Sequence, residues 1–377
     1  MHFFVLTVLP TIKSNQFAYQ KGKGTVDAII AAIDKWTLEI DEPNQKSTNI
    51  GFLDMSKAFD KMDRGKLITM LKLKKINPYL IRVIDSFLTD RTQAVRMNNI
   101  SSSTLPVPNG TPQGTLLGPM FWLLYIDSLD VDCHIIKYAD DLTLTSHTVS
   151  GLQHAVDQVA TWCKDHNMVA NATKSAVLHV SNKRSNINTS NIPQIQLDGA
   201  TISQAKSAKF LGVYVDEHLT FERHIQHIIS RTRPLTYVLL NLKRSGLPTE
   251  QLRSFYILCI RPIITYASPA WFTLLTQTQK DRIAKLEKIV LKVIKPMEES
   301  YADRLASLEL LPLDSEIERL SQDHMRKIKS PTHCLHHLLP PTNSASGRHS
   351  TRLIDVHNTR ARTQLRKNTF LMNFCNK

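Results

Sequence analysis

The residues of this chain that could carry chemistry are three carboxylates, two of which are adjacent. Asp140 and Asp141 lie between two short apolar runs, 135–136 and 142–145, that favour strands, and Asp is a preferred turn residue. The pattern predicts a buried hairpin with both aspartates at its tip. Adjacent like charges raise one another's pKa, so we expect a neutralising cation, Mg²⁺ first and Mn²⁺ as the alternative. The competing interpretation is a solvated acidic turn, which the apolar flanks disfavour.

A third carboxylate, Asp54, ends the apolar run 50–53. This run predicts a buried strand with Asp54 at its C-terminal end, followed by a turn or helix that carries Asp60 in a mainly structural role. An isolated buried Asp is costly, so Asp54 needs a partner or a metal, and a helix N-cap is the competing interpretation. Two divalent ions held about 4 Å apart by such carboxylates can activate a 3′-hydroxyl and steady a pyrophosphate leaving group. That chemistry is nucleotidyl transfer, and nucleases use it too.

Composition favours a partner that is a polyanion. The 377 residues include 47 Lys and Arg against 33 Asp and Glu, a formal charge of +14, so nucleic acid is the first candidate. The five cysteines include no CxxC pair, which excludes a disulfide framework and a zinc ribbon and fits a reducing compartment. The spacing of His333, Cys334, His336 and His337 matches no tetrahedral zinc pattern. The apolar run 3–9 is too short to span a bilayer, and no membrane partner is expected.

Two glycine-containing loops are candidates for binding a nucleotide. In the first, Gly22 and Gly24 alternate with Lys21 and Lys23 before a helix that Thr25 can cap, although no Gly-Lys-Ser/Thr sequence closes it as a P-loop. The second, 109–119, holds a lone Gln before an apolar helix at 120–129, and its glycines allow close backbone approach to a base pair.

The chain changes character at Phe221. From Phe221 onward the apolar spacing predicts helices only, and one helix between about 280 and 294 has a basic face that either is solvated or follows a phosphate backbone. That face comprises Lys280, Arg282, Lys285, Lys288 and Lys292. From about 330 the chain is rich in Pro, Ser, Asn and Arg, which predicts a loosely ordered tail.

Three blocks in this order resemble motifs A, B and C of reverse transcriptases. They are FLD with FD over 52–60, PQGTLLGP over 112–119, and YADD over 138–141. Further blocks resemble non-LTR (LINE-like) retrotransposon polymerases of the jockey and chicken-repeat type. They are QFAY at 16–19, HN at 166–167 before Lys174, FLGV at 210–213, and RPI at 261–263 with Tyr266 and Trp271. The resemblance covers nearly the whole chain.

The resemblance implies an α+β right-hand polymerase. Residues 1–47 would be partial fingers and 48–220 the palm, an antiparallel sheet with packed helices. Residues 221–330 would be an all-helical thumb or connection, and 331–377 a basic, loosely ordered tail. The implied activity is RNA-directed DNA synthesis with dNTPs on an RNA template and a DNA primer. Other element-encoded or host proteins are further candidate partners, and the nucleus is the expected location.

The resemblance also assigns roles to individual residues. Asp54 and Asp140 would ligate Mg²⁺, Met55 would contribute its carbonyl, and Asp141 would support the second ion. Lys174 would protonate the pyrophosphate; an exposed strand-edge lysine is the competing interpretation.

Further residues are assigned to the nucleotide and the primer. Phe59 would be the steric gate that excludes a ribose 2′-hydroxyl, against the interpretation as plain core. Gln113 and Gly114 would line the nucleotide pocket, and Lys21, in the glycine-containing basic loop, is a further candidate contact to the nucleotide phosphates. The primer and template contacts would be Leu211, Gly212 and Tyr138.

The chain departs from the family pattern at Gln20, where Arg is usual. The upstream fingers block and the apurinic-type endonuclease domain are also missing, so we expect an N-terminally truncated chain. The alternative to an active polymerase is therefore a catalytically silent remnant that only binds nucleic acid. A two-metal nuclease is disfavoured, because the Gln113 loop has no use there and no nuclease motif precedes it.

Overall fold

The computed structural model describes residues 11–182, 193–295, 300–339 and 361–375, and the apolar run 3–9 lies outside them. The chain forms two compact units, each continuous in space but not in sequence. The first consists of Met1–Gly24, Asn49–Leu178 and Asn188–Ala205; the second of Thr25–Thr48, His179–Ile187 and Lys206–Lys377. This division differs from the boundaries predicted from the sequence, because 25–48 and 206–220 belong to the second unit.

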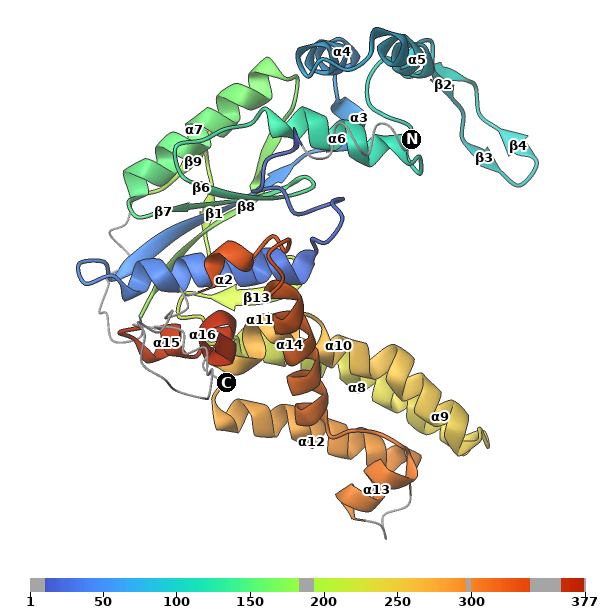
Figure 1. Ribbon diagram of the computed structural model, residues 1–377. Helices are drawn as coiled ribbons and strands as arrows, with labels where there is room; N and C mark the ends of the chain where they lie inside the picture. Colours follow the sequence, from blue (N-terminus) through green and yellow to red (C-terminus); the bar gives the residue numbers. More distant parts are fainter. Residues whose placement is uncertain (1–10, 183–192, 296–299, 340–360, 376–377) are drawn as a thin grey trace, which may run out of the picture. The chain divides into compact units, whose positions relative to one another are not determined.

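A five-stranded sheet is the centre of the first unit, with strand order β11-β8-β1-β7-β6 (Figure 1). Strand β7 pairs antiparallel with both β1 and β6, whereas β11 runs parallel to β8. The strands are β1 (Ser47–Met55), β6 (His134–Tyr138), β7 (Asp141–Ser146), β8 (Ala170–Ser181) and β11 (Ser203–Gln204). The predicted α+β class is confirmed, but the sheet is mixed and not purely antiparallel, because the edge strand β11 runs parallel to β8.

Two helices, α6 (Leu117–Asp127) and α7 (Val149–Asp165), lie over the same face of this sheet (Figure 1). Helix α7 begins after Thr148, whose side chain accepts a hydrogen bond from the Gly151 N–H, and its apolar face is buried in the core. Helix α6 is buried along almost its whole length, so it shows no amphipathic pattern. The two helices thus cover one face of the sheet and bury it in the core.

The connection between β1 and α6 carries short elements of its own. Helices α3 (Ala58–Lys61), α4 (Arg64–Leu73) and α5 (Pro78–Leu88) follow β1, with Asp63 and Asn77 as N-caps. Asn77 and Pro78 separate α4 from α5, because Asn caps the start of α5 and proline is favoured in the first helical turn. Two antiparallel pairs then form an arm (Figure 1): β2 (Thr92–Gln93) with β5 (Leu105–Pro106), and β3 (Arg96–Met97) with β4 (Ile100–Ser101). Beyond β8, β9 (Gln196–Leu197) pairs with β10 (Ala200–Thr201).

A buried lysine joins the sheet to α6. Lys137, on β6, is fully buried, and its ammonium donates hydrogen bonds to the carbonyls of Ile126 (3.0 Å) and Leu129 (2.6 Å). These carbonyls lie at the C-terminal end of α6, where backbone acceptors lack helical partners and a positive charge is favoured. Desolvation lowers the pKa of Lys137 to about 8, and the nearby Lys13 adds to this effect. The lysine thus places the β6–β7 turn relative to α6.

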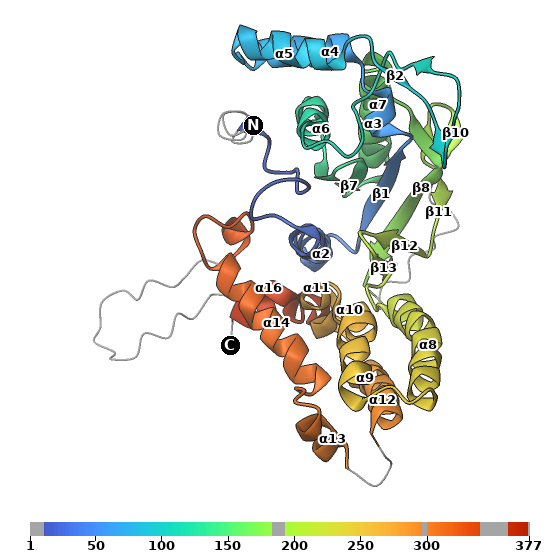
Figure 2. The same ribbon diagram turned by 90° about the vertical axis from the view of Figure 1, so that its right-hand side faces the viewer.

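The second unit is mostly helical. It contains α2 (Thr25–Asp41), the hairpin of β12 (Ser207–Phe210) and β13 (Val213–Asp216), and a series of helices visible in Figure 2. These are α8 (Glu222–Arg244), α9 (Thr249–Phe255), α10 (Arg261–Thr265), α11 (Ser268–Trp271), α12 (Gln277–Ile294), α13 (Tyr301–Ser307), α14 (Leu313–Ile328), α15 (Gln364–Lys367) and α16 (Phe370–Cys375). The stretch Thr249–Leu274 is long and apolar enough to cross a bilayer by length and composition, and half of its most apolar window is buried.

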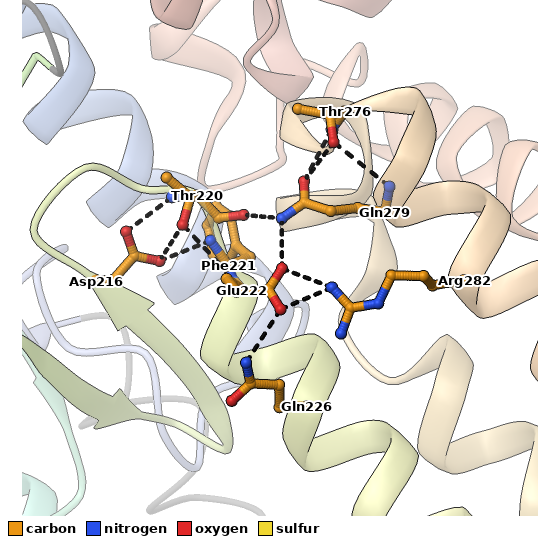
Figure 3. A network of polar contacts seen from close by, with 8 residues as sticks. All are labelled: Asp216, Thr220, Phe221, Glu222, Gln226, Thr276, Gln279 and Arg282. Carbon is orange, nitrogen blue, oxygen red and sulfur yellow. Dashed lines mark hydrogen bonds and ion pairs between the residues drawn. The ribbon is translucent and has the colours of Figure 1, made fainter.

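A polar network holds the start of α8 against α12 (Figure 3). The Asp216 carboxylate accepts hydrogen bonds from the backbone N–H groups of Thr220 and Phe221, and Phe221 adopts a left-handed φ of 59°. One residue later, the Glu222 carboxylate accepts two hydrogen bonds from the Arg282 guanidinium, at 2.6 and 2.8 Å. Arg282, predicted to lie on a basic helical face, is therefore paired within the protein.

A buried carboxylate joins α12 to three other helical segments of the same unit. Glu287, on α12, is fully buried and accepts hydrogen bonds from the hydroxyls of Tyr256 (2.6 Å) and Tyr301 (2.5 Å) and from the Leu313 N–H (3.1 Å). Burial next to this carboxylate raises the pKa of both tyrosines, so they stay protonated as donors.

The prediction of a loosely ordered tail is wrong at 361–375, while 340–360 lies outside the described residues. Here α15 and α16 pack on α2. The buried guanidinium of Arg366 forms an ion pair with the Asp34 carboxylate. The Asp41 carboxylate accepts hydrogen bonds from the backbone N–H groups of Arg362 and Thr363. Composition did not predict this order, because it does not show which distant segments meet. The few apolar residues of the tail and Arg366 find buried partners only in the folded chain.

The Lys137 contacts make a prediction about stability. Replacing Lys137 by Met removes the donors of two helix-end carbonyls, so we expect the free energy of unfolding to fall by about 2–4 kcal/mol in urea denaturation. The exposed Lys72, replaced by Met, is the control and should leave stability nearly unchanged.

The native chain and Lys137→Met should also differ in how their stability depends on pH. Because the folded pKa of Lys137 is lowered from 10.5 to about 8, the unfolded chain binds the proton more tightly between those values. The stability of the native chain relative to Lys137→Met should therefore increase as the pH rises from about 8 to 10.5. A constant difference over this window would contradict the buried position of the ammonium.

Candidate active site

The strand register brings the predicted carboxylates together at one end of the sheet. Asp54 on β1 pairs directly with Asp141 on β7, and Asp141 pairs on its other side with Tyr138 on β6. Directly opposed residues in antiparallel strands have Cβ atoms about 4.5–5.5 Å apart. Two carboxylates that are 87 positions apart in the chain numbering thus become immediate neighbours.

Asp140 is held beside this pair by a tight turn. Strand β6 ends at Tyr138 and β7 begins at Asp141, so Ala139 and Asp140 form a two-residue hairpin loop. Ala139 has a left-handed φ of 56°, which such loops require at their first position and which costs a residue other than glycine about 1–2 kcal/mol. Both aspartates lie at the turn, as the sequence predicted.

The site has an excess of negative charge that the protein only partly compensates. Desolvation raises the pKa of Asp140, and the charge of Asp54 adds to it. Desolvation together with the charges of Asp140 and Asp54 raises the pKa of Asp141 to about 6. On Asp54, the buried Oδ2 atom accepts no hydrogen bond from any described residue, and the Lys174 ammonium lies 3.8 Å from it. Uncompensated carboxylates of this kind are typical of a site for a divalent cation.

Strand β8 supplies that lysine. The Asp54 N–H donates to the Ser175 hydroxyl (3.3 Å) and the Ser56 N–H donates to the Val169 carbonyl (2.9 Å), so the end of β1 lies along the start of β8. Lys174 is 66% exposed at its side chain, and its charge opposes the rise in the pKa of Asp140. An exposed ammonium at the carboxylates can move as a ligand arrives.

The loop 109–114 is attached to the segment that follows Asp54. The N–H groups of Gly110 and Thr111 donate to the carbonyls of Met62 (2.8 Å) and Phe59 (3.0 Å). Gly110 has φ 76°, and a Cβ at this position would lie 2.6 Å from the Asp60 carbonyl oxygen, so only glycine allows this approach. The Gln113 amide donates to the Asp60 carboxylate (2.8 Å), which gives Asp60 the structural role predicted for it. Gly114 has φ 78° and open space around its Cα within the described part of the chain.

An aromatic wall lies next to the carboxylates. The Phe59 ring packs on the buried Trp122 ring with centroids 5.5 Å apart, and the Tyr19 ring meets Phe59 edge-on at 6.4 Å. Tyr19 is half exposed, and desolvation together with the Asp140 charge raises its pKa. Sequence reasoning did not place Tyr19 in the site, because nothing local links the loop 16–24 to residues more than 100 positions away.

The remaining predicted residues lie in two turns. Lys21 is exposed in the turn before α2, whereas Lys23 anchors this loop by donating to the carbonyls of Ser14 and Gln16. In the second unit, Leu211 and Gly212 form the two-residue loop of the β12–β13 hairpin, both with positive φ. The Tyr266 hydroxyl donates to the Leu211 carbonyl at 2.8 Å and fixes that turn.

A comparison with protein families identifies the site-bearing part of the chain. Residues 3–215 match the family described as "Reverse transcriptase (RNA-dependent DNA polymerase)". This range contains all three carboxylates, Lys174 and the loop 109–114.

Curated relatives are found among insect mobile elements. The chain is 27% identical over 312 residues to the "Probable RNA-directed DNA polymerase from transposon BS" of Drosophila melanogaster, covering 77% of this chain and 33% of that protein. It is 26% identical over 341 residues to the "RNA-directed DNA polymerase from mobile element jockey" of the same species, covering 85% and 36%. The chain therefore spans about a third of the length of these relatives.

Solved structures with some likeness are telomerases. Apo telomerase from Candida tropicalis is 11% identical with a TM-score of 0.41, covering 89% of this chain and 59% of that chain. Telomerase from Candida albicans, in complex with a fragment of telomeric RNA, is 12% identical with a TM-score of 0.39, covering 82% and 56%.

The electrostatics of the site predict how Asp141 affects stability. Its pKa is raised from 3.8 to about 6 in the folded chain, so its contribution to stability is present below pH 3.8 and is lost as the pH rises through about 6. Asn at this position stays neutral at every pH, so it keeps this contribution to stability. Above pH 6 and without divalent ions, we expect Asp141→Asn to melt about 2–4 °C higher than the native chain.

Magnesium should reverse that order. Mg²⁺ added during the same thermal melts should stabilise the native chain and have little effect on Asp141→Asn. The control is Asp90→Asn, an exposed residue whose left-handed φ of 51° suits Asn, and it should follow the native chain in both conditions. Equal responses to Mg²⁺ in all three proteins would argue against a cation site at Asp141.

Proposed function

This chain belongs to the reverse transcriptase family, and on that basis we propose that it copies RNA into DNA by two-metal nucleotidyl transfer as the polymerase part of a non-LTR retrotransposon protein. The observation that carries the proposal is the meeting of Asp54, Asp140 and Asp141 at the ends of β1, β6 and β7. Its substrates would be an RNA template, a DNA primer and dNTPs.

The three carboxylates fit Mg²⁺, a hard cation that prefers oxygen ligands. Asp54 and Asp140 would hold it with the Met55 carbonyl, and Asp141 would support a second ion. When bound, the ions would lower the pKa of the primer 3′-hydroxyl and neutralise charge on the leaving pyrophosphate. The pKa of Asp141, about 6, lies below neutral pH, so its carboxylate is mostly ionised where the reaction would run.

Lys174 is suited to the protonation step. Its ammonium lies at the carboxylates and is exposed, so it can reach an oxygen of the leaving pyrophosphate. Lys174 would donate one proton to that oxygen as the bond to the α-phosphorus breaks, and solvent would return the proton to the neutral amine.

The incoming nucleotide would lie between the aromatic wall and the loop 109–114. Phe59 is supported from behind by the buried Trp122, so its ring resists displacement by a ribose 2′-hydroxyl. The positive φ of Gly114 and the open space around it allow close approach of a base or sugar. Lys21, exposed in its turn, would contact the triphosphate.

Nucleic acid would be bound largely through phosphate contacts. On α12, the exposed lysines Lys285, Lys288 and Lys292 supply positive charge, whereas Arg282 is paired with Glu222. The Leu211–Gly212 turn, held by Tyr266, would support the primer, and Tyr138 would lie beside the primer and template. Binding through such contacts weakens steeply with salt.

Primer extension tests the proposal. With Mg²⁺, dNTPs and an RNA template, the native chain should lengthen a labelled DNA primer, and Asp140→Asn should extend it about 100-fold less or worse, because a metal ligand is lost. Asp157→Asn, an exposed change on α7 that keeps the carbonyl acceptor for Gln153, should extend normally.

The products and binding separate this function from its rivals. No extension by the native chain, together with salt-dependent binding of the primer-template duplex, would favour a silent nucleic-acid binder. Shortened primer in the presence of Mg²⁺ would instead indicate a nuclease.

The steric role of Phe59 can be measured separately. Phe59→Val should raise ribonucleotide incorporation relative to deoxynucleotides by about tenfold or more, because the ring no longer excludes the 2′-hydroxyl. Leu67→Val, a truncation in the same core, should keep the native ratio while lowering stability. A Phe59→Val chain that loses stability but keeps its selectivity would show that Phe59 is only core.

A further inference from the structure

We propose that the second unit holds a zinc ion bound by Asp27, His324, His333 and Cys334. Asp27 lies in the first turn of α2, His324 on α14, and the other two residues in the turns that follow α14. The site is separate from the three carboxylates of the first unit and does not depend on the proposed polymerase activity.

The donor atoms already lie close together. One ligand atom from each of Asp27, His333 and Cys334 lies within 4.8 Å of the other two. Asp27 Oδ1 is 3.0 Å from His324 Nε2 and 3.5 Å from His333 Nε2, and Cys334 Sγ is 4.0 Å from His333 Nδ1. Zinc bonds of about 2.0–2.3 Å place neighbouring ligands of a tetrahedral site roughly 3.3–3.7 Å apart. Small side-chain rotations would close the site, with His324 turning in as the fourth ligand.

The imidazoles have the chemistry that a metal needs. His333 Nδ1 accepts a hydrogen bond from the Leu335 N–H at 3.2 Å, so this nitrogen is unprotonated, and a metal would take its lone pair in exchange for that bond. Asp27 would give up its 3.5 Å contact with His333 Nε2 and bind the ion instead. His324 Nε2 is buried and makes no hydrogen bond with any described residue, although the Asp27 oxygen is 3.0 Å away. The two atoms are therefore close, but their geometry is not that of a hydrogen bond. Two atoms that bind the same metal ion have this relation, because both point at the ion and not at each other.

Burial favours zinc over an ion pair alone. The side chains of Asp27, His324 and His333 are only 7%, 15% and 10% exposed, so an ionised carboxylate here needs compensating charge. The negative charges of Asp27 and a Cys334 thiolate would balance the two positive charges of Zn²⁺. Binding would replace the thiol proton, which leaves to solvent. A thiol adds nothing to a His–Asp ion pair, whereas it is a preferred zinc ligand together with imidazole.

Metal binding to the purified full chain tests the proposal. After removal of metal by a chelator, the chain should take up about one Zn²⁺ in competition with a chromophoric chelator. Co²⁺ in place of Zn²⁺ should give thiolate-to-cobalt charge-transfer absorption, which Cys334→Ser abolishes. Cys334→Ser and His333→Ala should each weaken Zn²⁺ binding by about 100-fold or more, beyond the 10–100-fold typical of residues around the ligands. His324→Ala should weaken it less than either.

Controls from the same chain keep the test specific. Cys259→Ser and His337→Ala change an exposed cysteine and an exposed histidine outside the cluster and should bind Zn²⁺ as the native chain does. Far-ultraviolet circular dichroism of each variant separates lost binding from lost folding. A native chain that binds Zn²⁺ no more tightly than the folded Cys334→Ser variant would overturn the proposal and leave the cluster as an ion-paired anchor.

Discussion

The repulsion among Asp54, Asp140 and Asp141 is the constraint on which the first unit depends. The β1–β7 register makes Asp54 and Asp141 direct neighbours, and the strained Ala139 turn adds Asp140. The raised pKa values of Asp140 and Asp141 record the cost of this arrangement. Such electrostatic repulsion is tolerated where a bound cation or substrate relieves it. Backbone strain and shifted pKa values are common at functional sites for this reason.

The surrounding elements keep those carboxylates in place. Lys137 ties β6 to the end of α6, and the α6 residue Trp122 supports Phe59, which follows β1. The close approach at Gly110 then joins the loop 109–114 to the same segment. The three carboxylates, the Phe59 ring and the loop 109–114 are thus built on one core. A change at any of them would be transmitted to the others through packed side chains.

In the second unit, buried polar groups take the place of a large sheet. Glu287 and the Asp34–Arg366 pair each join elements distant in sequence, and each is satisfied by several hydrogen bonds. Such networks are costly when one partner is removed, so they specify one arrangement of helices. They also divide the basic residues into those that hold the unit together, such as Arg282, and those free to face a polyanion, such as Lys285.

The sequence by itself determined the family and the strands and turn that carry Asp54, Asp140 and Asp141, because these follow from local apolar patterns and ordered motifs. Only the tertiary structure decided which carboxylates pair, that Lys137 is buried, and that Tyr19 stands beside Asp140. It also decided that the tail packs on α2 and that Asp27 meets His333 and Cys334. The physical reason is that burial and ion pairing depend on which distant segments meet. Local propensity contains no information on such contacts.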